Sequence, residues 1–113
     1  MPQRRVSNEM IIDFKDLGMP VFTGRERGQQ ARIDLKLDQL AANEVVEVRI
    51  PEDTYAVTSS FFLGLFGPSV RTLGGEGFAR QFQFTGPAFI TGKVSDWVLR
   101  ALRDKRDIFG RAP

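Results

Sequence analysis

The stretch Val45-Val46-Glu47-Val48-Arg49-Ile50-Pro51 decides the fold class, because it has the pattern of a strand with one buried face. Apolar residues at positions 46, 48 and 50 alternate with Glu47 and Arg49, so the two kinds of side chain point to opposite faces of a sheet. The proline has no N–H group to donate to a neighbouring strand, and it ends the element. A strand over residues 45–50 is therefore predicted.

A largely apolar helix is predicted after this strand, beginning near Thr58. The hydroxyl groups of Thr58, Ser59 and Ser60 are of the kind that cap helix N-termini, and an apolar run over residues 61–73 follows them. Pro68 removes one backbone donor and crowds the preceding turn. We therefore expect a kink in this helix, or two short helices joined at positions 67–68.

A strand and a further helix are predicted on the amino-terminal side. Residues 10–14 are β-branched and aromatic, and glycine and proline follow them at positions 18 and 20. Thr23 and Glu26 match a capping box, and apolar residues at 33, 37, 40 and 41 favour one helix over residues 24–42. Residues 33–37 also alternate as a strand would, which is the alternative for that segment.

The carboxyl-terminal half predicts a turn, a strand and a final helix. Glycines mark the turn at residues 74–77, and phenylalanines at 78, 82 and 84 alternate with smaller or polar residues. Apolar residues then follow a helical face from Ile90 towards Lys105. The order β-α-β-α-β-α predicts one α/β domain over residues 10–107, with a small, mostly parallel sheet and three principal helices. Residues 1–9 and 108–113 are expected to be tails.

Composition excludes several classes of function. A chain of 113 residues is long enough for one core. It contains no cysteine and no histidine, so it has no thiol nucleophile, no histidine base and no zinc site built from these residues. We expect no catalytic residue, no metal and no cofactor. Without a run of about 18 apolar residues or a signal peptide, the chain is expected to be cytoplasmic and to have no contact with a membrane.

Basic residues gather in two places. The first is the predicted first helix, where Arg25, Arg27 and Arg32 form either an anion-binding patch or a solvated face. The second is the carboxyl-terminal end, where two aspartates accompany five basic residues: Arg100, Arg103, Lys105, Arg106 and Arg111. This excess of positive charge either complements the negative end of the helix dipole or attracts a phosphate, an acidic partner or nucleic acid.

The run Val57-Thr58-Ser59-Ser60-Phe61-Phe62-Leu63-Gly64-Leu65-Phe66 resembles the phosphoacceptor region of STAS domains, the fold of bacterial anti-sigma factor antagonists. It is more similar still to the STAS-like family of unknown function, in which Ser-Phe opens this helix. Gly24-Arg25, Gly28 and Arg32 match that family's first helix in type and order, and the similarity spans residues 10–105. The resemblance implies a non-enzymatic module that binds a histidine-kinase-like ATPase or an anti-sigma factor. It also implies that phosphorylation of one hydroxyl group of the module breaks this complex.

The start of the second helix holds the candidate site. Ser60 matches the family's phosphoacceptor and Ser59 is the neighbouring candidate, with helix capping as the alternative role of both. Thr58, Phe61 and Phe62 are the candidate partner contacts. Adjacent aromatics on a helix diverge by about 100°, so we expect one ring to face the sheet and the other to lie near the surface as an anchor.

The resemblance to STAS-like domains implies a regulatory protein-binding module rather than an enzyme, and we expect residues 58–62 to be its contact surface. The oligomeric state stays open. Nucleic-acid binding through Arg25, Arg27, Arg32 and the carboxyl-terminal basic residues is the alternative, and it would require an affinity that falls with salt.

Overall fold

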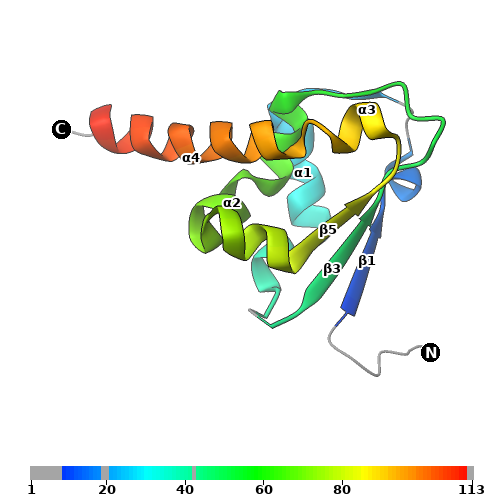
Figure 1. Cartoon of the computed structure of the whole chain (residues 1–113), viewed down its shortest axis with the longest axis horizontal. Coiled ribbons are helices and arrows are strands. Elements are labelled where there is room, and N and C mark those ends of the chain that lie inside the picture. Colours follow the sequence, from blue (N-terminus) through cyan, green and yellow to red (C-terminus); the bar gives the residue numbers. More distant parts are fainter. Residues whose placement is uncertain (1–8, 19–20, 42, 112–113) are drawn as a thin grey trace.

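The chain folds into a small parallel sheet with helices packed on it (Figure 1). The computed structural model describes residues 9–18, 21–41 and 43–111, and in these ranges the side chains of residues 10–103. The elements in chain order are β1 (Glu9–Asp13), the 3-10 helix η2 (Phe14–Leu17), β2 (Val21–Phe22), α1 (Arg25–Asp34), the 3-10 helix η3 (Leu37–Gln39), β3 (Val45–Arg49), β4 (Ala56–Val57), α2 (Ser59–Gln81), β5 (Phe82–Thr85), α3 (Ala88–Thr91) and α4 (Val94–Arg111).

The main sheet has the order β1-β3-β5, and both pairings are parallel. The register aligns Ile12 with Val48 and Val48 with Phe84 on the face that the helices cover. A separate parallel pair joins β2 to β4. The expected α/β class, with a small parallel sheet and three principal helices (α1, α2 and α4), is confirmed.

The opposite face of the main sheet is mixed: among the described residues it carries Glu47, Arg49 and Gln83, and also Val45 and Ile11, of which Ile11 is 52% exposed. Ile11 lies in register with Glu47, and Glu47 with Gln83. Glu47 accepts a hydrogen bond from Arg49 at 2.9 Å, and this bond raises the pKa of Arg49. Val46, Val48 and Ile50 are buried, so the alternation predicted for residues 45–50 is confirmed.

Helix α1 is shorter than predicted. It ends at Asp34, Lys36 adopts a left-handed conformation, and η3 follows, so neither a helix through residue 41 nor a strand over residues 33–37 forms. Residue 42 lies outside the described residues. The expected capping box is also wrong, because the N-cap is Gly24 and no side chain caps it. The buried face of α1 carries Gly28, Ala31 and Arg32, and it leaves Ile33 64% exposed.

The interruption of α2 lies at Gly74 and not at Pro68. The helix continues through Pro68, and residues 61–67, 69 and 70 around it are buried. This packing offsets the hydrogen bond that proline cannot donate. Gly74 has a φ of 77° and a ψ of 169°, a conformation that glycine adopts without steric cost.

The predicted strand over residues 78–84 starts late, because α2 extends to Gln81 and β5 begins at Phe82. Phe78 and Phe82 are four residues apart, a spacing that suits a helix as well as a strand. The buried Gln81 side chain donates hydrogen bonds to the carbonyl oxygens of Ala41 and Glu44, at 2.9 and 2.8 Å. It therefore ties the end of α2 to the connection before β3.

The final helix forms in two pieces, α3 and α4. Helix α4 continues to Arg111, where the sequence predicted a tail from residue 108, and Figure 1 shows its end reaching past α2. The predicted tail over residues 1–9 falls largely outside the described residues. Among the described helices, none combines the length and the apolar character needed to cross a membrane.

Candidate functional site

The start of α2 is held by a close crossing of α1 and α2. A Cβ atom added to Gly28 would clash with the carbonyl oxygen of Phe61, and one added to Gly64 would clash with that of Arg25. The two backbones are therefore in direct contact, which glycine permits because it has no side chain. This contact fixes the position of the first two turns of α2 relative to α1.

Arg32 fastens the same two helices. Its Nη1 donates to the Leu65 carbonyl oxygen at 2.9 Å and to Ser69 Oγ at 3.0 Å, and its Nε donates to Asp38 at 2.9 Å. Its side chain is 10% exposed. The expectation that Arg32 belongs to a surface anion patch is therefore wrong, because its guanidinium group is used inside the protein.

The three hydroxyl residues at the start of α2 have different surroundings. Thr58 is the N-cap, and its Oγ1 accepts a hydrogen bond from the Phe61 N–H at 3.2 Å. Its own N–H donates to the Phe22 carbonyl oxygen at 2.9 Å, which joins the cap to β2. Ser59 is half-buried and Ser60 is exposed. Capping, which the sequence left open among the three, belongs to Thr58.

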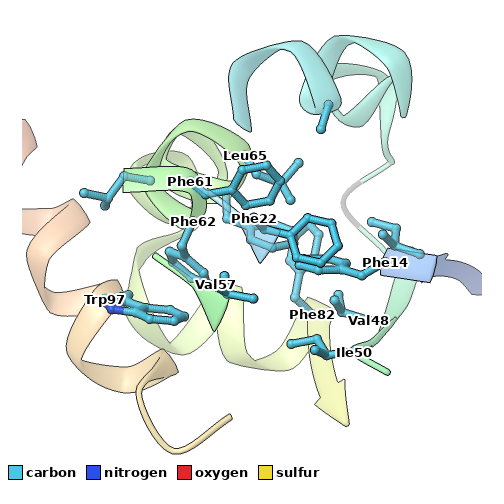
Figure 2. Packing of buried hydrophobic residues seen from close by; sticks show 14 of the residues in the cluster. Phe14, Phe22, Val48, Ile50, Val57, Phe61, Phe62, Leu65, Phe82 and Trp97 are labelled. Atoms are coloured by element: carbon cyan, nitrogen blue, oxygen red, sulfur yellow. The ribbon is translucent and has the colours of Figure 1, made fainter. Parts of the chain in front are cut away.

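Phe61 and Phe62 are both buried, at 1% and 2% exposure, so the expectation that one of them lies at the surface is wrong. The Phe61 ring packs against Phe14 and Phe22, with centroids 6.0 and 5.5 Å away. Phe62 lies 5.2 Å from Trp97 of α4 (Figure 2). Because α2 is covered by other elements on both sides, two rings that diverge from it are each buried.

Ser59 connects the start of α2 to α4. Its Oγ accepts a hydrogen bond from Arg100 Nη1 at 2.8 Å. Arg100 borders a cleft of about 360 Å³, which we call the α4 cleft and which is lined by Lys93, Asp96, Trp97, Leu99, Arg100 and Arg103. Ser59 therefore lies beside part of the carboxyl-terminal basic cluster, a contact that the sequence did not predict.

The α4 cleft was not predicted from the sequence, although the sequence contains a pattern that indicates it. Lys93, Asp96, Arg100 and Arg103 recur at i, i+3, i+7 and i+10, which places them along one side of a helix. The basic patch expected on α1 is smaller than predicted. Arg25 and Arg27 are exposed, but Arg32 is buried.

A larger groove of about 690 Å³ lies between the end of α2, β5 and α4. Phe78, Phe82, Val98 and Leu102 contribute to its apolar lining, and none of the lining residues whose side chains the structure describes is charged. Within the described part of the chain, no group of three acidic, histidine or cysteine residues is arranged to hold a metal ion. The start of α2 and the α4 cleft are therefore the candidate site, because hydroxyl groups and charged side chains of the described residues lie together there.

The comparisons give no relative from which a role could be transferred. No protein-family model, no curated protein and no solved structure matches this chain. The resemblance to STAS-like domains consequently rests on the residues that carry it, at positions 24–32 and 57–66. A function for the site has to be inferred from its own geometry.

Proposed function

We propose that this chain is a non-enzymatic, cytoplasmic regulatory module of the STAS-like type, which binds a histidine-kinase-like ATPase through the start of α2. Phosphorylation of Ser60 by that partner would release the complex. The observation that carries the proposal is the exposure of Ser60 in the first turn of α2, next to a cap that Thr58 supplies. The Ser60 hydroxyl is thus accessible to a kinase and is not needed for capping.

The position of Ser60 also suits a phosphoryl group. The first turn of a helix has N–H groups without intrahelical partners, and these groups and the helix dipole stabilise an anion. A phosphoryl group adds about 1.5 to 2 negative charges at neutral pH, enough to repel an acidic or apolar partner surface. Ser59 suits the role less well, because it is half-buried and already bonded to Arg100.

Tyr55 offers the aromatic contact that the buried Phe61 and Phe62 do not. It precedes Thr58 by three residues and is 76% exposed. Tyrosine supplies a large contact area with little conformational entropy to lose, and it is common among the residues that dominate binding energy. We therefore place the contact surface on Tyr55, Ser59 and Ser60.

Nucleic-acid binding has less support than protein binding. It would need several cations spread along a surface that follows a phosphate backbone. Burial of Arg32 removes one of the three cations proposed on α1. If the chain binds neither DNA nor RNA at low ionic strength, this alternative is eliminated.

The experiment uses the full chain, a purified ATPase of the histidine-kinase-like class, ATP and Mg²⁺. We expect intact-mass spectrometry to detect one added phosphoryl group, which Ser60→Ala abolishes and the matched variant Ser59→Ala retains. In calorimetric titrations, Ser60→Asp should bind the ATPase about tenfold more weakly, because it places a charge in the interface. Unchanged affinity of Ser60→Asp, or phosphorylation that persists in Ser60→Ala, would remove Ser60 from the proposal.

A further inference from the structure

We infer that the α4 cleft binds an acidic segment of the protein partner. This inference rests on the proposed function, since it adds a second contact to the same protein complex. The cleft opens beside the start of α2, because Arg100 borders it and also donates a hydrogen bond to Ser59. A partner that covers Ser59 and Ser60 would therefore meet the α4 cleft as well.

The charge of the cleft selects an acidic ligand. Among the residues whose side chains the structure describes, Lys93, Arg100 and Arg103 give the cleft three positive charges and Asp96 gives it one negative charge. These four residues are exposed, so a carboxylate can approach them from solvent. Arginine binds carboxylates through two parallel hydrogen bonds, which gives such a contact direction as well as attraction.

The cleft also has an apolar part. Trp97 lines it and is 8% exposed, while Leu99 lines it and is 55% exposed. A segment that mixes acidic and apolar residues can therefore place its carboxylates on the cations and an apolar side chain on Leu99. Burial of that apolar surface would add to the affinity in a way that salt does not screen.

Arg100 is held ready for this contact. One of its terminal nitrogens, Nη1, donates to Ser59 Oγ at 2.8 Å, which restricts a side chain that would otherwise sample many rotamers. A guanidinium group has five N–H donors, and the bond to Ser59 uses a donor on Nη1, so the group keeps others with which it can bind a carboxylate. Ser59 is accordingly a positioning residue, and fixing Arg100 before binding lowers the entropy lost on association.

An acidic peptide fits the cleft better than a nucleic acid does. Asp96 lies among the cations and would repel a phosphodiester chain, in which every unit carries a charge. A peptide can instead place an uncharged residue or a hydrogen-bond donor next to Asp96. Nucleic-acid affinity also grows with the number of phosphates contacted, and one short cleft offers few contacts.

The test measures binding of a fluorescein-labelled peptide of alternating glutamate and leucine to the full chain by fluorescence anisotropy, without any ATPase. Peptides with lysine or glutamine in place of glutamate are the controls. We expect the glutamate peptide to bind most tightly, and its affinity to fall as salt rises. Arg100→Gln should weaken binding about tenfold, as expected for loss of a charge-assisted contact, and Ser59→Ala about threefold.

The matched control is Arg80→Gln, which removes an exposed arginine from the opposite end of α2. Equal weakening by Arg80→Gln and Arg100→Gln would overturn the inference, because net charge would then explain the binding. Equal affinity for the glutamate and glutamine peptides would also overturn it. So would tighter binding of a labelled single-stranded DNA that Arg100→Gln abolishes, since the cleft would then be a nucleic-acid site.

The peptide titration and the phosphorylation assay can fail independently of each other. The peptide titration depends on the α4 cleft and needs neither ATP nor Ser60, whereas the phosphorylation assay depends on Ser60 and the ATPase. Peptide binding in a chain that no ATPase phosphorylates would leave the α4 cleft intact and refute the switch. Phosphorylation of a chain that does not bind the peptide would support the switch at Ser60 and refute the inference about the α4 cleft.

Discussion

The two sides of α2 are packed by opposite means. On the side of α1, glycines bring the two backbones into contact, and Arg32 adds hydrogen bonds to Leu65 and Ser69. On the side of β5 and α4, aromatic rings fill the space, with Phe66 within 5.7 Å of the rings of Phe78 and Phe82. One side therefore tolerates no added atom and the other depends on large side chains, so matched substitutions should have opposite effects on them.

The largest effect on stability is expected from removing a ring on the side of α2 that faces β5 and α4, which we call the aromatic side. Phe66 is fully buried, so Phe66→Ala removes its ring contacts and leaves a cavity. We expect the free energy of unfolding to fall by about 4 kcal/mol. Urea denaturation followed by circular dichroism measures it, with Phe66→Leu as a milder control that should retain most of the stability. A loss below about 1 kcal/mol would show that the aromatic side is not the main support of α2.

The next largest effect is expected from adding atoms on the side of α2 that faces α1, which we call the glycine side because Gly28 and Gly64 meet there. In Gly64→Ala the added methyl group meets the Arg25 carbonyl oxygen, and α1 must move away. We expect a loss of about 3 kcal/mol, at the upper end of overpacking costs. The control is Gly75→Ala on the other side of α2, where the new atom would lie 3.8 Å from Val98. That variant should be neutral or gain up to about 1 kcal/mol from helix propensity, and equal losses in the two variants would remove the contrast.

Removal of the guanidinium group tests the polar fastening on the glycine side. Arg32→Met keeps much of the side-chain length but leaves the buried Ser69 hydroxyl and the Leu65 carbonyl oxygen without that donor. We expect a loss of about 2 kcal/mol. Asp38→Asn is the control, because Asp38 is 74% exposed, and it should cost less than about 1 kcal/mol. Thermal unfolding of both variants would measure the difference, and a stable Arg32→Met would reduce Arg32 to a packing role.

The smallest effect separates the cap from the proposed switch. Thr58→Ala removes the bond to the Phe61 N–H and should cost about 1 kcal/mol. Ser60→Ala should stay within about 0.5 kcal/mol, because Ser60 is exposed and does not cap. Denaturation midpoints of the two variants provide the comparison. A larger loss for Ser60→Ala than for Thr58→Ala would mean that Ser60 supports the fold.

Local patterns failed where one pattern fits two structures. Residues 33–37 suit both a helix and a strand, and the chain forms neither, because α1 buries a face of small residues and Arg32 instead of the apolar face that the spacing indicated. Phe78 and Phe82 suited a strand until packing placed the first in α2. At Pro68, burial of the surrounding helix outweighed the local preference for a kink.

The sequence by itself determined the alternation of β3, the start of α2 and the α/β class, because periodicity, capping hydroxyls and element order act over short distances. Tertiary structure decided that Phe61 and Phe62 are both buried, that Arg32 is internal and that Arg100 meets Ser59. Each of these facts depends on which elements pack against α2. Residues 59 and 100 are 41 positions apart, and no local pattern records their contact. The physical reason is that the burial of a side chain is set by its neighbours in space, which the packing of helices on the sheet brings together.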